Sequence, residues 1–256
     1  MSLTEQARPP IAFALDFADR AEALAAAREV APAIGMVKVG LELFVREGPS
    51  VVTLGRDVGL PVFLDLKLHD IPETVERAVA QASTLGARLV TVHASGGRTM
   101  LNRAVARAES EGAGLAVCAV TILTSLDDAD LDDIGFESGV TLPPEPDGIV
   151  RTRTSYAAEK LARLAWDEGV RWFVCSPAEV KYLRRALGPD AVLVTPGVRP
   201  AGGNTTDDQK RVATPERAIQ DGASWVVVGR PIRDAKDRLV AARSIADAIA
   251  RVKVSS

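Results

Sequence analysis

The stretch "PVFLDLKLHDIPETVERAVAQASTLGARLVTVH" (residues 61–93) contains one complete strand–helix–strand unit. Its two ends, 61–67 and 88–93, are short apolar runs rich in Val and Leu, which is typical of buried β-strands. The segment between them, 73–87, repeats apolar residues at helical spacing with charged residues in between. Strands joined through a helix run parallel, so this stretch predicts a parallel sheet covered by helices.

The same alternation runs along the whole chain. Eight parallel strands alternating with helices in 256 residues predict an α/β fold, a single-domain (β/α)₈ TIM barrel. A doubly wound open sheet is the competing fold, but no glycine-rich dinucleotide fingerprint follows the first strand. We therefore assign residues 11–256 to the barrel and residues 1–10 to an N-terminal extension. The other strand candidates are residues 11–16, 36–40, 115–121, 171–176, 191–196 and 224–229.

The composition of the chain argues against several classes of binding partner and cofactor. The chain is 47% hydrophobic, and its net charge of −3, without a basic run, argues against nucleic acid or an anionic membrane as a partner. No apolar run approaches the roughly 18 residues of a membrane span, and the N-terminus has no apolar signal segment, so we expect a cytoplasmic protein. Cys118 and Cys175 are expected to be buried, reduced thiols. Two Cys and two His, well separated, predict no metal site.

Charged residues interrupt three predicted strands near their carboxyl ends. Side chains alternate between the two faces of a strand, so Phe63, Asp65 and Lys67 are expected to share the face that points into the barrel. Lys38 interrupts the second strand, and Asp16 ends the first. Unpaired buried charges are costly, so these four charges must pair with each other or with a ligand. The alternative to a functional site is a purely structural cluster of ion pairs.

The residues that follow this strand, "HDIPET" (69–74), predict the start of a helix. Asp70 would lie near the N-cap and Pro72 in the first turn. Capping the helix does not exclude a role for Asp70 in catalysis. His69 and His93 stand at strand ends, where an ordinary hydrogen-bonding role is at least as well supported as acid–base chemistry.

The last two strands end in a pattern typical of phosphate binding. Arg199 and Arg230 follow them directly, at the rim where the loops of barrel enzymes often hold a phosphate group. Gly229 would let the backbone approach an anion, and arginine can hold phosphate oxygens in a bidentate manner.

Two connections are too long to be simple turns. Residues 122–152 and 197–213 both follow the carboxyl ends of strands, so both are candidate functional loops. The acidic part of the first is better explained as a surface insertion than as catalytic machinery.

Seven segments, in this order, resemble the family of orotidine 5′-phosphate decarboxylases, in its bacterial, monofunctional form. The D-x-K-x-x-D pattern within them is shared with related phosphosugar enzymes, whereas the complete set is specific. The resemblance implies a (β/α)₈ barrel that forms a homodimer and converts orotidine 5′-monophosphate to UMP and CO₂ in pyrimidine biosynthesis, with no metal or organic cofactor. The segments are "LDF" (15–17), "VKVGLELF" (37–44), "DLKLHDIPET" (65–74), "LTS" (123–125), "TPGVR" (195–199), "DDQKR" (207–211) and "VVGR" (227–230).

The resemblance also implies roles for individual residues. Lys67 would be the catalytic lysine that protonates C6 of the substrate, and Asp65 would lie against the substrate carboxylate. Lys38 and Asp70 would complete an alternating Lys–Asp–Lys–Asp array, with Asp70, Ile71 and Thr74 reaching the site of the neighbouring subunit. The implied substrate-binding residues are Asp16 and Lys38 at the ribose, Thr124 and Ser125 at the pyrimidine, Arg199, Gln209, Gly229 and Arg230 at the phosphate, and Pro196 beside them.

Two other functions stay open at this point. A metal-dependent phosphosugar decarboxylase or aldolase of the same barrel suprafamily would carry an acidic metal ligand near the position of Lys38, and a lysine there disfavours a divalent cation. A non-catalytic nucleotide-binding barrel would lack the catalytic lysine or its acids, whereas Lys38, Asp65, Lys67 and Asp70 are all present. The sequence therefore favours the decarboxylase.

Overall fold

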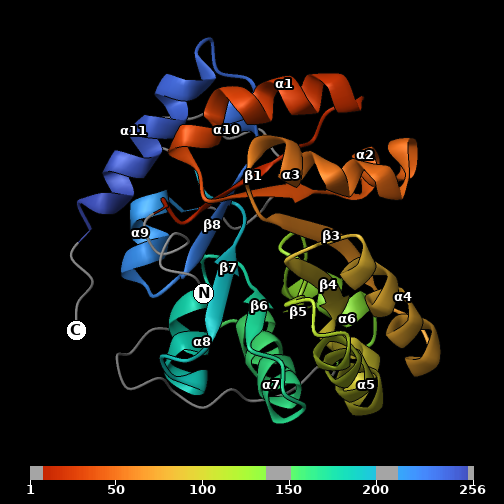
Figure 1. Ribbon diagram of the computed structural model, residues 1–256. Helices are drawn as coiled ribbons and strands as arrows, with labels where there is room; N and C mark the ends of the chain where they lie inside the picture. The colour runs from red at the N-terminus through yellow and green to blue at the C-terminus, as the bar shows by residue number, and fades with distance from the viewer. Residues whose placement is uncertain (1–7, 137–150, 200–212, 253–256) are drawn as a thin grey trace.

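The computed structural model describes residues 8–136, 151–199 and 213–252. Its strands close into one barrel in the order of the sequence, every neighbouring pair is parallel, and the last strand pairs with the first (Figure 1). The predicted (β/α)₈ fold is confirmed. The strands are β1 (Ile11–Ala14), β2 (Met36–Val39), β3 (Val62–Leu68), β4 (Leu89–His93), β5 (Ala116–Val120), β6 (Trp172–Val174), β7 (Val192–Thr195) and β8 (Trp225–Val228).

Helices follow every strand and lie on the outside of the barrel (Figure 1). Short 3₁₀ segments, Ala31–Ala33 and Ala94–Gly96, join helices to strands, and a third, Pro49–Thr53, joins two helices. The α-helices are α1 (Arg20–Val30), α2 (Leu41–Glu47), α3 (Leu54–Val58), α4 (Pro72–Thr84), α5 (Gly97–Ser110), α6 (Asp128–Asp133), α7 (Arg153–Asp167), α8 (Val180–Leu187), α9 (Pro215–Gln220), α10 (Arg230–Arg233) and α11 (Arg238–Ala250).

The hydrophobic core has two layers, one inside the barrel and one between the strands and the helices. Phe63, Met36 and Leu89 belong to the inner layer. Leu64, the residue after Phe63, belongs to the outer layer, as does Phe173. Successive strand residues therefore face opposite layers, which is the alternation expected of a parallel sheet covered by helices.

Strand β3 departs from this alternation at its carboxyl end. Leu64 pairs with Val90 and Leu68 pairs with Val92, so three residues of β3 face a single residue of β4. Lys67, inside this irregular segment, has φ of 51° and is the one non-glycine residue with positive φ in the described part of the chain. The regular alternation expected for Phe63, Asp65 and Lys67 is thus interrupted by a bulge, although Asp65 and Lys67 still reach the same cavity.

Local signals in the sequence set several helix starts. Asp19, Thr152, Thr214 and Asp237 each accept a hydrogen bond from a backbone N–H in the first turn of the following helix. Such caps satisfy donors that the helix itself leaves without a partner.

The start of α4 follows the prediction with one refinement. Pro72 occupies the first turn, as expected. The capping position itself belongs to Ile71, and the carboxylate of Asp70 accepts a hydrogen bond from the Ile71 N–H at 2.6 Å. Asp70 therefore holds the entry to the helix without capping its first turn.

The acidic segment after β5 is structural. Asp127 and Asp130 form a reciprocal capping box at the start of α6, and Arg153 binds the side chain of Asp132. The backbone N–H groups at the start of α7 donate to Asp128. These carboxylates join α6 to α7, in agreement with a surface insertion. The proline-rich part of this connection, 137–150, lies outside the described residues.

Residues 8–10, which precede β1, lie against the amino end of the barrel. Pro10 accepts a hydrogen bond from Val226 of β8 at 3.0 Å, and Arg8 donates to the carbonyl of Gly59 at 3.2 Å. The boundary between extension and barrel at residue 11 stays a prediction. In the ranges that the structure describes, no helix combines the length and apolar character needed to cross a lipid bilayer.

Candidate active site

A cavity of about 230 Å³ opens at the carboxyl ends of the strands. This is the end at which barrel enzymes build their sites, because loops from all strands converge there. Most of the positions that the sequence singled out come together in it. Those that line the cavity are Asp16, Lys38, Asp65, Lys67, Thr124, Pro196, Arg199, Gly229 and Arg230.

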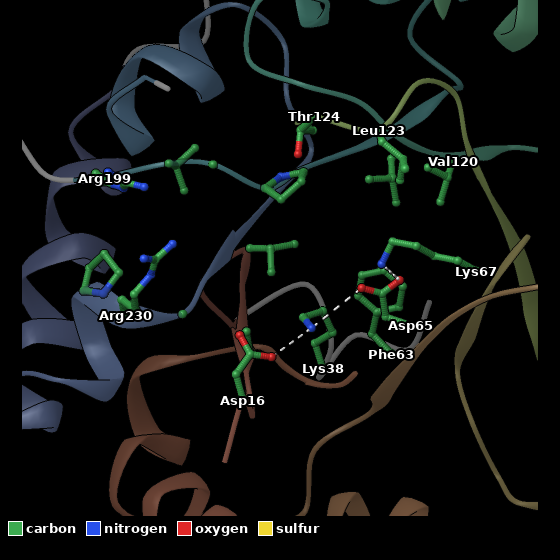
Figure 2. A pocket seen from close by; sticks show the side chains of 18 of the residues that line it. Asp16, Lys38, Phe63, Asp65, Lys67, Val120, Leu123, Thr124, Arg199 and Arg230 are labelled. Atoms are coloured by element: carbon green, nitrogen blue, oxygen red, sulfur yellow. Dashed lines mark hydrogen bonds and ion pairs between the residues drawn. The ribbon is translucent and has the colours of Figure 1, made fainter. Parts of the chain in front are cut away.

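A chain of alternating charges crosses one side of the cavity (Figure 2). The Lys67 Nζ lies 2.8 Å from Asp65 Oδ1, and the Lys38 Nζ lies 3.6 Å from Asp65 Oδ2. Lys38 also donates to Asp16 Oδ1 at 3.3 Å. Asp65 therefore stands between two ammonium groups, and Lys38 stands between two carboxylates.

The electrostatics of the cavity favour an ionised Asp65. Burial by itself would raise the pKa of Asp65, but the nearby ammonium groups of Lys38 and Lys67 and the hydrogen bonds of Lys67 and Thr91 outweigh it, and the pKa lies below its usual range. A carboxylate fixed between two cations keeps its charge at neutral pH. The cavity therefore contains a permanent negative charge directly beside the Lys67 ammonium.

Gly40, directly after β2, keeps room for this arrangement. A Cβ atom at Gly40 would lie 3.0 Å from Lys38 Nζ and 3.6 Å from Asp16 Oδ1. A side chain here would push against the Lys38 ammonium where it bridges the two carboxylates. Gly40 belongs to the segment "VKVGLELF" (37–44), and no role was predicted for it from the sequence.

Two arginines lie on the other side of the cavity, away from Lys67 and Asp65 (Figure 2). Arg230 begins α10 directly after Gly229, and Arg199 follows β7. The Arg199 N–H donates to the carbonyl of Ala213 at 2.9 Å, so the chain is tied together on both sides of the segment 200–212. Because the arginines and Lys67 lie on opposite sides of the cavity, one ligand could place an anionic group at the arginines and a reacting atom beside Lys67.

The walls between these two ends are apolar, and of their residues only Phe63 was predicted to face into the barrel. Phe63, Val120, Ile122, Val174 and Val227 line the cavity. Each comes from a strand or its carboxyl end, where an inward side chain looks in sequence like any other core residue. Strand parity was the available signal for the other four, but without an interrupting charge it does not say which face points inward.

Several expected residues lie away from the cavity in this single chain. Asp70, Ile71 and Thr74 are exposed at the start of α4, and Ser125 is exposed beside Thr124. None of them lines the cavity. Gln209 belongs to the segment 200–212 and lies outside the described residues.

Thr91 of β4 was also missed, and it contacts both central residues. Its side chain is fully buried. The Thr91 hydroxyl donates to Asp65 Oδ1 at 3.1 Å and accepts the backbone N–H of Lys67 at 2.7 Å. Threonine is common in strands for reasons of packing, so its presence in "RLVTVH" carried no signal by itself.

His69 and His93 lie together, beside the segment of β3 that contains Asp65 and Lys67. The rings of His69 and His93 have centroids 5.3 Å apart and are tilted by 36°. Burial, with the added charges of His69 and Lys67, lowers the pKa of His93 below its usual value, against a weaker opposing effect of Asp65. Neither histidine lines the cavity.

The donor set of the cavity suits an organic anion better than a metal ion. Across the described ranges, no three His, Cys, Asp or Glu side chains gather closely enough to hold a metal. Asp16 and Asp65, the two carboxylates of the cavity, share the Lys38 ammonium. A divalent cation prefers several oxygen ligands, and here a protein cation lies between the two available carboxylates.

Comparison with known proteins agrees with this geometry. Residues 9–245 match the model of the "Orotidine 5'-phosphate decarboxylase / HUMPS family". The orotidine 5′-phosphate decarboxylase of Anaeromyxobacter sp. (strain K) is 52% identical, over 92% of this chain and 96% of its own. That of Frankia casuarinae is 46% identical, over 93% of this chain and 87% of its own.

Solved structures show the same likeness in three dimensions. A crystal structure of orotidine 5′-phosphate decarboxylase from Lactobacillus acidophilus has a TM-score of 0.74 and 34% identity, and the match covers 94% of this chain and 99% of that one. The match of the family model extends from the residues before β1 into the last helix. This chain therefore belongs to the orotidine 5′-phosphate decarboxylase / HUMPS family.

Proposed function

We propose that this protein is a carboxy-lyase that converts orotidine 5′-monophosphate to UMP and CO₂. The observation that carries the proposal is the placement of Asp65 between two ammonium groups, across one cavity from two arginines. The names of the relatives agree with it. In this role the protein would supply UMP for pyrimidine biosynthesis.

The substrate would span the cavity with its phosphate at the arginines. Arg199 and Arg230 can donate paired hydrogen bonds to phosphate oxygens, and Gly229 leaves the backbone beside them open. The ribose hydroxyls would meet Asp16 and Lys38, whose charges are already paired at 3.3 Å. This pose directs the pyrimidine ring toward Lys67.

The pyrimidine would lie between the apolar walls and the loop after β5. Thr124 lines the cavity there, and Ser125 follows it. Pro196, directly after β7, lines the cavity near Arg199. Hydrogen bonds from this loop would set the orientation of the ring, while the apolar walls exclude water from its reacting edge.

The chemical step requires electrostatic stabilisation of a carbanion. When the C6–carboxylate bond breaks, its electron pair stays on C6 in an orbital that the ring cannot delocalise, and CO₂ departs. The Lys67 ammonium beside C6 would stabilise this charge and then transfer one proton from Nζ to C6. The neutral amine recovers its proton from solvent. Lysine suits this step because arginine would hold its proton too tightly.

Asp65 would have two functions in this step. It keeps the Lys67 ammonium in place, as the 2.8 Å contact indicates. It would also lie beside the substrate carboxylate, so that loss of CO₂ removes a repulsion between two negative charges. No metal or organic cofactor takes part in the proposed step.

We also propose a homodimer in which Asp70, Ile71 and Thr74 serve the neighbouring site. In the single chain Ile71 is 65% exposed, and Asp70 stays outside the cavity. The exposure of all three residues at the start of α4 leaves them accessible to a second subunit. Mixing Lys67→Ala and Asp70→Ala subunits should restore activity, because each heterodimer would own one intact site. No recovery from an isolated heterodimer would contradict the shared site.

We place the enzyme in the cytoplasm. Cys118 and Cys175 are both free and buried, which agrees with a reducing compartment. Burial raises the pKa of the Cys118 thiol well above its usual value, so this thiol stays protonated and unreactive.

The decisive experiment follows the ultraviolet absorbance of orotidine 5′-monophosphate mixed with EDTA-treated protein. The wild type should consume the substrate, Lys67→Ala should not, and Lys181→Ala, which removes a lysine from the exposed surface of α8, should behave as the wild type. Turnover of a phosphosugar with added magnesium, and none of orotidine 5′-monophosphate, would favour the metal-dependent branch of the family and overturn the proposal.

A further inference from the structure

Thr91 faces the irregular segment of β3 from the neighbouring strand. Between Leu64, paired with Val90, and Leu68, paired with Val92, β3 has three residues where β4 has only Thr91. Its side chain is 0% exposed. Two extra residues preserve the parity of β3, so that Leu64 and Leu68 both still pack against the outer core. The bulge therefore displaces the segment with Asp65 and Lys67 without disturbing the strand on either side.

The hydroxyl of Thr91 connects the two central residues of the cavity. It accepts the backbone N–H of Lys67 at 2.7 Å and donates its own proton to Asp65 Oδ1 at 3.1 Å. The same Asp65 Oδ1 accepts from the Lys67 ammonium at 2.8 Å. The backbone and the side chain of Lys67 are thus both tied to the Thr91–Asp65 pair.

The backbone of Lys67 needs such a partner. Lys67 has φ of 51°, a backbone conformation that is unfavourable in free energy for residues other than glycine. Such strain persists only where the surrounding structure fixes the backbone by several contacts. In a regular parallel ladder the N–H of β3 would donate to a carbonyl of β4. Here the ladder is interrupted, and the Lys67 N–H donates to the Thr91 hydroxyl instead.

We infer that Thr91 is a positioning residue for the decarboxylation, which holds the strained Lys67 backbone and the Asp65 carboxylate in the geometry that aims the Lys67 ammonium at the reacting carbon. The inference rests on the proposed function and extends it to a residue that does not line the cavity. Thr91 acts through its hydroxyl alone, because only an atom that both accepts and donates a hydrogen bond can serve Lys67 and Asp65 together.

The consequences of losing the hydroxyl follow from this geometry. Thr91→Val keeps the shape of the side chain but leaves the Lys67 N–H and one lone pair of Asp65 without their partner. Thr91→Ser keeps the hydroxyl and loses only a methyl group. A matched control is Thr121→Val, because Thr121 is also buried and its hydroxyl donates to the carbonyl of Val174, between β5 and β6.

The kinetic test compares the three variants with orotidine 5′-monophosphate as substrate. Thr91→Val should lose about 10- to 100-fold in kcat, the scale of one misplaced catalytic group, with affinity for UMP changed less than about threefold. Thr91→Ser and Thr121→Val should retain kcat within about threefold of the wild type. If Thr91→Val matches Thr121→Val in kcat, or loses UMP affinity in parallel with kcat, the inference is overturned.

A second measurement separates this inference from the proposed function. Hydrogen exchange of the Lys67 amide, followed by NMR in ¹⁵N-labelled protein, should accelerate at least about tenfold in Thr91→Val but not in Thr91→Ser, because the hydroxyl protects that amide. Wild-type protein without decarboxylase activity would overturn the proposed function. In that case, selective acceleration at Lys67 would still support the positioning by Thr91, and unchanged exchange would overturn it.

Discussion

Lys67 Nζ lies 2.8 Å from Asp65 Oδ1, and the two residues are two positions apart on the same strand. Both residues lie in the irregular segment of β3, where Lys67 adopts φ of 51° and the ladder with β4 is interrupted. A strained backbone at a partly buried ion pair indicates a segment held for function.

Asp65→Asn should abolish most of the activity while the barrel stays folded. The amide cannot fix two ammonium groups or oppose the substrate carboxylate, so we expect kcat/KM to fall by about 10³-fold or more, the scale of losing a central electrostatic group. Steady-state kinetics would measure the loss, and circular dichroism would verify the fold. Activity within tenfold of the wild type would contradict the central role of Asp65.

Arg230→Ala should weaken binding of the substrate, because the side chain that would hold the substrate phosphate is lost. We expect kcat/KM for orotidine 5′-monophosphate to fall by about 10²-fold, the scale of one charge-assisted pair of hydrogen bonds. With orotidine, which lacks the phosphate, the same substitution should change kcat/KM very little. Arg243→Ala, on the exposed face of α11, serves as the control. Equal losses with both substrates would show that Arg230 does not act on the phosphate.

Gly40→Ala tests the space around Lys38. The new methyl group would lie 3.0 Å from Lys38 Nζ, closer than ordinary contacts allow, so the ammonium must move away from Asp16 or Asp65. Because Gly40 has φ of −95°, alanine fits its backbone, and the free energy of unfolding should change by less than about 1 kcal/mol. We expect kcat/KM to fall about tenfold, a typical effect of a small misplacement. Wild-type kinetics would show that Lys38 tolerates displacement.

His93→Gln should flatten the dependence of stability on pH. The pKa of His93 is lowered in the folded protein from a reference value of 6.5, so the unfolded chain binds the proton first as pH falls. The free energy of unfolding of the wild type should therefore decrease as pH falls below about 6.5, by at most about 1.4 kcal/mol per pH unit from this residue. Urea titrations between pH 7 and pH 5 would measure it. Parallel curves for the two proteins would contradict this assignment.

Arg184→Met should destabilise the barrel without changing catalysis. The guanidinium of Arg184 is partly buried at the amino end of the barrel, and its loss would leave several carbonyl groups without a donor, at a cost of about 2–4 kcal/mol in the free energy of unfolding. Urea denaturation would measure the loss, and KM should stay at the wild-type value. The exposed neighbour Arg185 provides the control. Arg184 donates to the carbonyls of Gly188, Pro189, Ala191 and Gly222 and to the hydroxyl of Ser224.

The charged cluster could be predicted because each member breaks a local pattern. Lys38 and Asp65 interrupt apolar strands, and the cost of burying an unpaired charge implies that they meet. The two arginines could be predicted from their positions after the last two strands. Thr91 could not, since a threonine in a strand breaks no pattern.

The bulge in β3 could not be predicted for a related reason. Whether a strand keeps its register depends on the strand with which it pairs. Neither the sequence of β3 nor that of β4 by itself indicates the register shift between them. Regular alternation therefore placed Asp65 and Lys67 in the correct cavity but missed the strained geometry of Lys67. Apart from Phe63, the apolar wall residues were missed because inward and outward residues of a fully covered strand are equally hydrophobic.

The sequence by itself determined the number and order of the strands, the barrel class and the family, because apolar periodicity and motif order are properties of the chain. The tertiary structure decided which polar groups touch. Hydrogen bonds act only within about 3.5 Å, and residues such as Thr91 and Lys67 reach that distance only after neighbouring strands have paired. The sequence therefore shows that Lys67 and Asp65 carry opposite charges on one strand, whereas the geometry of their contact depends on the neighbouring strand.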